Sequence, residues 1–149
     1  MTEIRFYHLE SQTLDQVLPA LLVKALENGH KIIVKTKDEQ EAERINTHLW
    51  TYNPDSFLPH GTEKDGNKTD QPVWITSTDN NPNTADVLIL TQGTQSDQLS
   101  DYALVCVMIN GLDNDAITNA RTRWKSYKEA GYDVTYWQQS AQGGWSKKS

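Results

Sequence analysis

The sequence predicts a three-layer α/β/α fold with a mostly parallel central sheet. Two patterns along the 149-residue chain lead to this prediction. Short apolar runs, typical of buried strands, alternate with segments whose apolar residues recur every three or four positions, as they do in amphipathic helices. A chain that alternates strand and helix places its strands in parallel and covers both faces of the sheet with helices.

The first 50 residues predict four elements, in the order strand, helix, strand, helix. Residues 4–8 alternate like a strand, and a helix follows from about residue 14, because Thr13 and Gln16 fit a capping box. Pro19 lies inside this helix and lacks a backbone donor, which predicts a late start or a kink. Residues 31–35 are expected to form a buried strand, and residues 38–49 a second amphipathic helix.

The rest of the chain continues the alternation. The expected elements are strands at about residues 73–77, 87–90 and 104–108, a helix at 113–130 and a last strand at 133–137. Residues 61–71 and 79–83 are expected to be loops because of their turn-forming side chains. From Ser140 the composition becomes polar around Trp145, which predicts a tail or a loosely docked end. We therefore expect one α/β domain over residues 1–139 and a polar tail over 140–149.

Composition restricts the possible functions. The net charge of −6 and the pI near 5.1 disfavour binding to phosphate backbones, so any contact with DNA is expected to be indirect. No apolar run approaches the ~20 residues of a membrane-spanning helix, and the first residues lack the pattern of a secretory signal. A cytoplasmic protein without membrane contact is expected. Cys106 is the only cysteine, which excludes an internal disulfide.

A strand–helix–strand opening resembles nucleotide-binding folds, but the phosphate-binding loop is missing. Neither G-x-x-x-x-G-K-[ST] nor G-x-G-x-x-G occurs, and the turn after the second expected strand is Thr36-Lys37-Asp38, without glycine. Glycines are needed there because they let backbone amides approach a phosphate. The expected fold is therefore used for another purpose, since function belongs to sites rather than to folds.

The sequence also lacks the usual signatures of catalysis and metal binding. The four histidines are far apart, and there is no C-x-x-C or H-E-x-x-H spacing for a metal. No nucleophile motif such as G-x-S-x-G appears. Asp113-Asn114-Asp115 precedes a helix, where short polar side chains cap free amides. We expect no catalytic residue, no metal and no cofactor.

One short segment of this acidic chain is basic. Residues 121–128 hold four basic and two aromatic side chains, and helical spacing places Arg121, Trp124, Lys125 and Lys128 on one face. Cations beside an indole ring suit an acidic peptide with a hydrophobic end. The same pattern is also typical of the wet face of an amphipathic helix, and the spacing leaves both interpretations open. Arg123 falls to the side and is expected to be solvated or paired locally.

A second aromatic segment lies at residues 50–61. It contains Trp50 and Phe57 in a stretch with two prolines. Aromatic side chains on a stiffened loop can form a binding edge, or they can fill the core beneath a helix end. The residues alone leave both possibilities open.

Four stretches together resemble the chi subunit of bacterial DNA polymerase III holoenzyme. The most specific is Leu-Trp at 49–50 followed by Phe-Leu-Pro-His at 57–60. The others are Phe-Tyr-His-Leu at 6–9 with the helix at 17–22, the strand at 85–90, and the basic segment with the glycine at 131. They fall in the family's order and cover nearly the whole chain. At residues 110–113 this chain reads Asn-Gly-Leu-Asp, whereas many chi sequences have Asp-Gly-Arg-Asp, so the resemblance implies weaker affinity for an acidic partner.

The resemblance implies a non-catalytic adaptor with an α/β fold. In the family, chi pairs with the psi subunit of the clamp loader and binds the acidic C-terminal tail of single-stranded DNA-binding protein. Carried over by motif, the basic residues of the tail pocket are Arg121, Lys125 and Lys128, with Trp124 in an aromatic position, and its apolar wall is Trp50 and Phe57. The alternative is a nucleotide- or nucleic-acid-binding α/β domain that uses the basic helix on phosphates.

Overall fold

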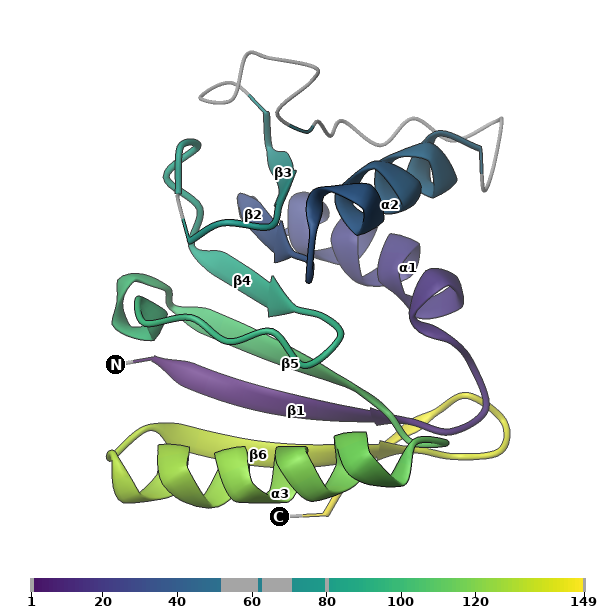
Figure 1. Ribbon diagram of the computed structural model, residues 1–149, viewed down its shortest axis with the longest axis vertical. Coiled ribbons are helices and arrows are strands. Elements are labelled where there is room, and N and C mark those ends of the chain that lie inside the picture. Colours follow the sequence, from purple (N-terminus) through teal and green to yellow (C-terminus); the bar gives the residue numbers. More distant parts are fainter. Residues whose placement is uncertain (1, 52–61, 63–70, 80, 149) are drawn as a thin grey trace.

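The computed structural model describes residues 2–51, 62, 71–79 and 81–148 (Figure 1). In this part of the chain, seven strands form one sheet in the order β3-β2-β4-β5-β1-β6-β7. All neighbouring pairs are parallel except β6 with β7. The strands are β1 (Glu3–Leu9), β2 (Ile32–Lys35), β3 (Val73–Thr76), β4 (Val87–Leu90), β5 (Leu104–Asn110), β6 (Asp133–Gln139) and β7 (Trp145–Lys147). The helices are α1 (Leu14–Glu27), α2 (Glu39–Thr51), α3 (Asn114–Glu129) and the short 3-10 helix η1 (Leu99–Asp101).

The three α-helices cover the two faces of the sheet unequally. Apolar side chains of α1 and α2 pack against one face, in a cluster that includes Leu18, Ile45 and Val34. On the other face, α3 packs through Ala120 against a cluster that includes Phe6 and Ile33. Neighbouring strand residues such as Ile33 and Val34 enter opposite clusters because side chains alternate along a strand. The predicted three-layer α/β/α fold is confirmed, with α3 alone among the α-helices on its face (Figure 1).

Helix α1 begins earlier than its proline predicts. The capping box between Thr13 and Gln16 is present, and the helix starts at Leu14 and continues past Pro19. A proline at this position leaves the carbonyl of Asp15, four residues earlier, without its helical donor. In the fold, His48 of α2 donates from Nε2 to that carbonyl at 2.7 Å. Of the two alternatives, late start or kink, the late start is wrong: the capping box starts the helix at Leu14, and a tertiary hydrogen bond satisfies the carbonyl that the proline leaves free.

The C-terminal residues extend the sheet. Where the sequence indicated a polar tail or a loosely docked end, residues 145–147 form β7, which pairs antiparallel with the end of β6. The ring of Trp145 packs edge-on against Tyr7, with 5.0 Å between ring centroids. Gln139, the last residue of β6, is buried, and its Oε1 accepts from the backbone amides of the three residues 10–12, at 3.1–3.2 Å. The end of β6 therefore holds the turn between β1 and α1.

The connections that leave β1 and β5 diverge. These strands are neighbours, but β1 leads to α1 on one face, and β5 leads to α3 on the other. In open α/β sheets, such a divergence opens a crevice at the carboxyl ends of the two strands, where ligands commonly bind. This end of the sheet is therefore the expected location of a ligand site. Within the described ranges, no helix combines the length and the apolar character that crossing a membrane requires.

Candidate functional site

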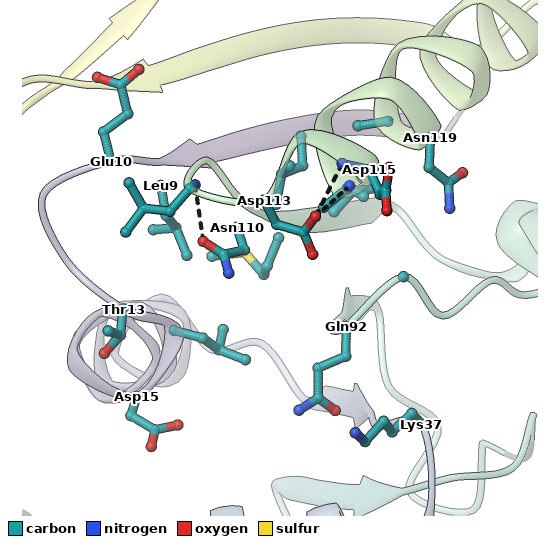
Figure 2. A pocket seen from close by; sticks show the side chains of 18 of the residues that line it. Leu9, Glu10, Thr13, Asp15, Lys37, Gln92, Asn110, Asp113, Asp115 and Asn119 are labelled. Atoms are coloured by element: carbon teal, nitrogen blue, oxygen red, sulfur yellow. Dashed lines mark hydrogen bonds between the residues drawn. The ribbon is translucent and has the colours of Figure 1, made fainter.

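A crevice does lie at the carboxyl ends of β1 and β5, with a volume of about 830 Å³ (Figure 2). Leu9 and Asn110, at the ends of the two strands, line it, together with the first turns of α1 and α3. Gln92 and Lys37 lie across from the start of α3. This is the position at which related architectures hold nucleotides, so its chemistry tests the nucleotide-binding alternative.

The helix starts at the crevice are occupied by the chain's own side chains. Thr13 Oγ1 accepts from the amide of Gln16 at 3.3 Å, and Asp113 Oδ1 accepts from the amides of Asp115 and Ala116 at 3.0 and 3.3 Å. Asp15 and Asp115 add negative charge to the first turns of α1 and α3. Free amides and the positive end of the helix dipole are what attract a phosphate to a helix start. Here both are already compensated.

Two of the three cations around the crevice, Arg44 and Arg123, are also engaged. Arg44 forms ion pairs with Asp15 at 2.6 Å and with Glu41 at 2.8 Å. The Arg44 side chain lowers the pKa of Asp15, and hydrogen bonds from Gln92 and then Arg44 lower the pKa of Glu41, so both carboxylates stay ionised at neutral pH. Lys37, the third cation of the lining, is exposed and forms no ion pair with the described residues. The geometry therefore disfavours a phosphate group in this crevice.

The structure decides between the two alternatives for Arg123. The residue is only 7% exposed, so the expectation of solvation is wrong, whereas local pairing is confirmed by a hydrogen bond from Nη2 to Tyr127 Oη at 3.2 Å. The same nitrogen donates to the carbonyl of Thr94 at 2.8 Å. Thr94 belongs to the segment after β4, which helical spacing could not place near α3. Arg123 ties this segment to the helix.

The other basic residues of α3 are arranged differently. Arg121, Lys125 and Lys128 are exposed, and none forms an ion pair with a carboxylate of the described residues. Lys128 Nζ lies 5.0 Å from the centroid of the Trp124 ring, a cation–π distance. Trp124 is half-buried and packs on the core beneath α3. The four residues therefore form a cationic surface centred on an indole ring.

A small pocket lies beside this cationic surface. Its volume is about 320 Å³, and Arg121 and Trp124 of α3 line it together with His8 of β1 and with Tyr136 and Gln138 of β6. The Trp124 Nε1 atom is buried and has no hydrogen-bond partner in the described part of the chain. A cationic rim and an aromatic wall therefore meet at one pocket, which we call the Trp124 pocket.

The sequence patterns did not predict the strand residues of the Trp124 pocket. His8 and Gln138 are register partners in the parallel pair of β1 and β6, and Tyr136 lies two residues before Gln138 on the same face. The signal available was the polar and aromatic alternation along residues 136–138, but only strand pairing places it beside α3.

A hydrogen-bonded chain fixes these strand side chains. His8 Nδ1 lies 2.6 Å from Tyr136 Oη, and His8 Nε2 lies 3.5 Å from Glu10 Oε1. Gln138 Nε2 donates to the same Glu10 oxygen. Burial raises the pKa of Tyr136 while the Arg121 charge opposes this rise, so the phenol stays neutral at physiological pH. The pocket floor is therefore polar but uncharged at Tyr136, below a cationic rim.

Two predicted site residues cannot be placed with the others. Phe57 and the side chain of Trp50 lie outside the described residues. The helix that carries Trp50, α2, packs on the face of the sheet opposite α3. The structure thus brings together Arg121, Trp124, Lys125 and Lys128, and it leaves the proposed apolar wall untested.

The sequence matches a known family over most of its length. The family described as DNA polymerase III chi subunit, HolC, matches residues 1–135 of the chain. The chain belongs to the DNA polymerase III chi subunit family. Membership assigns it to DNA replication and implies a partner within the polymerase complex.

Individual chi proteins are similar over different lengths. The probable DNA polymerase III subunit chi of Rickettsia prowazekii (strain Madrid E) is 32% identical over 94 residues, which span 63% of this chain and 57% of that protein. The DNA polymerase III subunit chi of Escherichia coli (strain K12) is 23% identical over 142 residues, covering 90% of this chain and 96% of that protein. The Haemophilus influenzae subunit is 23% identical over 127 residues, covering 83% and 85%.

Proposed function

We propose that the chain is a non-catalytic adaptor that links the clamp-loader complex to the acidic C-terminal tail of single-stranded DNA-binding protein. The observation that carries this proposal is the Trp124 pocket, which is bordered by exposed cations without ion pairs in the described chain. The resemblance to chi supplies the ligand, because the tail in that family is acidic and ends in phenylalanine.

The chemistry of the tail fits each part of this surface. The terminal phenyl ring would enter the pocket and pack against Trp124. The pocket volume of about 320 Å³ is at the small end of the range for ligand sites. The terminal carboxylate would then lie at the rim near Arg121, where a guanidinium can bind it with two parallel hydrogen bonds. Lys125 and Lys128 lie one and two helical turns further along α3, within reach of acidic residues that precede the phenylalanine.

The adaptor has a second partner in this proposal. The family pairs chi with psi in the clamp loader, and a polymerase-complex partner follows from family membership. We assign no residue to psi. Trp50 and Phe57 stay predicted residues of the tail site, to be tested by substitution to alanine in the same assay.

Fluorescence anisotropy tests the tail site directly. A labelled acidic peptide that ends in Pro-Phe is titrated with the wild type, with Lys125→Glu and with Lys24→Glu. Lys24 is exposed on α1, so its substitution makes the same charge change on the opposite face of the sheet. The wild type is expected to bind near micromolar, about −8 kcal/mol, and Lys125→Glu to bind at least tenfold more weakly.

The outcomes separate the function from the site. Equal loss in Lys24→Glu and Lys125→Glu would mean that net charge alone attracts the peptide, and it would refute the site. Absence of wild-type binding would refute the adaptor role toward the tail. A labelled single-stranded oligonucleotide tests the nucleic-acid-binding alternative. If it binds more tightly than the peptide, with a steep salt dependence, the chain contacts nucleic acid directly and the proposal fails.

A further inference from the structure

The crevice between β1 and β5 has a charge opposite to that of the Trp124 pocket. Its lining carries the carboxylates of Glu10, Asp15, Glu41, Asp113 and Asp115 and the cations of Lys37, Arg44 and Arg123. Arg44 is neutralised by Asp15 and Glu41, and Arg123 is buried against a carbonyl and a phenol. The five carboxylates outnumber the three cations, so the lining is net negative; Lys37 is its exposed cation, and the carboxylates outside the Arg44 pairs lie at the start of α3 and at the end of β1.

The start of α3 presents its carboxylates to the crevice. Asp113 and Asp115 both line it, and neither takes part in an ion pair within the described ranges (Figure 2). Favourable interaction with the helix dipole accounts for acidic residues in this turn. It does not account for the apolar side chain immediately before the cap.

The side chain of Leu112 is 83% exposed. Among the described residues, no other large hydrophobic side chain is classed as exposed. It lies on the rim of the crevice, whose floor includes the apolar side chains of Leu9, Ile109 and Ala116. A contiguous apolar surface rimmed by polar residues is typical of protein interaction sites, and Leu112 adds its side chain to the apolar lining of the crevice. Leu112 and the crevice floor together therefore offer one apolar surface to a partner.

A rigid turn holds Leu112 in this position. The amide of Leu112 donates to Asn110 Oδ1 at 3.0 Å, and the amide of Gly111 donates to the carbonyl of Leu9 at 2.8 Å. The next amide, that of Asp113, donates to the carbonyl of Asn110 at 3.1 Å. Because the backbone on both sides of Leu112 is fixed, little conformational entropy of the loop is lost when a partner covers it.

We propose that this crevice is the docking site for a basic segment of a partner protein in which an arginine or lysine is followed by an apolar residue. The cation lies between Asp113 and Asp115, and the apolar side chain packs on Leu112 and the crevice floor. Charge complementarity selects this occupant: the capped helix starts and paired arginines disfavour phosphates, and the carboxylates repel an acidic tail. The site is separate from the Trp124 pocket, so it does not depend on the proposed tail binding.

Amide NMR spectroscopy of the full chain tests the site. The probe is the blocked peptide acetyl-Ala-Arg-Leu-Ala-Arg-Leu-amide, titrated into the ¹⁵N-labelled protein. We expect its addition to shift the amides of Leu112, Asp115 and Asn119, and to leave those of Lys125 and Lys128 in place. A peptide with glutamate in place of arginine should not shift the crevice amides.

The matched variants are two pairs of substitutions that each remove two negative charges. In Asp113→Asn with Asp115→Asn, asparagine keeps the helix cap, and the peptide should bind at least tenfold more weakly. In Glu129→Gln with Asp133→Asn, both residues are exposed, one at the last position of α3 and the other at the first position of β6, and binding should stay within twofold. Leu112→Ser should also weaken binding, without change in the folded spectrum.

Several results would overturn the proposal. Absence of crevice shifts at millimolar peptide, or equal weakening in both paired variants, would show that the crevice does not select a basic segment. Crevice shifts caused by ATP with magnesium would identify a nucleotide site instead. The acidic Pro-Phe peptide is a separate titration with separate amides, so failure here leaves the tail site unaffected, and the reverse also holds.

Discussion

Gly111→Ala is the substitution with the clearest expected effect on stability. A β-carbon built on Gly111 lies 2.1 Å from the carbonyl oxygen of Leu9 and 2.6 Å from ring atoms of His8. Because the nearest atom belongs to the backbone of β1, the contact cannot be relieved by rotation of a side chain. The strand end or the turn must move by about an ångström, and the hydrogen bond from the Gly111 amide to the same carbonyl must distort.

The magnitude follows from these two effects. Overpacking in a close-packed site costs about 1–3 kcal/mol, and a weakened backbone hydrogen bond costs about 1 kcal/mol more. We expect the free energy of unfolding to fall by about 2–4 kcal/mol. For a chain of this size that corresponds to a decrease in Tm of roughly 5–15 °C.

Urea unfolding followed by circular dichroism measures this change, with Gly144→Ala as the control. The nearest atom to a β-carbon on Gly144 is Ser140 Oγ at 3.5 Å, an ordinary contact, so the control should stay within about 0.5 kcal/mol of the wild type. Neither glycine has a positive φ, so backbone strain does not separate them. A loss below 0.5 kcal/mol in Gly111→Ala would refute the steric argument.

Three further predictions concern buried or paired groups. Gln139→Leu removes the acceptor of three backbone amides in the β1–α1 turn, and we expect urea unfolding to give a loss of about 2 kcal/mol; an unchanged midpoint would contradict it. Arg44 lowers the pKa of Asp15 in the folded state. The pair therefore stabilises the folded protein at pH values above the ordinary carboxyl pKa, and this stabilisation is lost as the pH falls through the lowered pKa of folded Asp15. The stability difference between wild type and Asp15→Asn should therefore shrink from pH 6 to pH 2, and a constant difference would argue against it. Burial raises the pKa of Cys106 to about 12, so a thiol reagent at pH 8 should label it only after denaturation; rapid labelling of the native protein would refute its burial.

The order of elements was predictable because each depends on local patterns. Apolar runs and helical spacing located β2, β4 and α3 to within a few residues, and the capping box located the start of α1. The late start expected from Pro19 was wrong because a local rule was applied to the carbonyl of Asp15. His48, 33 residues away along the chain, donates a hydrogen bond to that carbonyl. Local rules cannot include a donor from another helix.

The site was predictable only where it lies on one element. Arg121, Trp124 and Lys125 share a helix, so spacing alone placed them on a common surface. His8 and Tyr136 are separated by 128 residues and meet only because β1 pairs with β6. Helical spacing predicted local pairing as one alternative for Arg123 but not its second partner, because the carbonyl that accepts from its guanidinium is 29 residues away, after β4. Contacts of this kind follow from topology rather than from periodicity.

Strand β6 serves two parts of the molecule through alternate residues. Tyr136 and Gln138 line the Trp124 pocket, whereas Trp137 packs on the opposite core and Gln139 holds the β1–α1 turn at the crevice. A slip of one residue along this strand would exchange the two sets, because side chains alternate with a period of two. It would empty the pocket and release the turn together. Evolution can therefore vary the chemistry of either site one side chain at a time, but an insertion or deletion within β6 changes both sites at once.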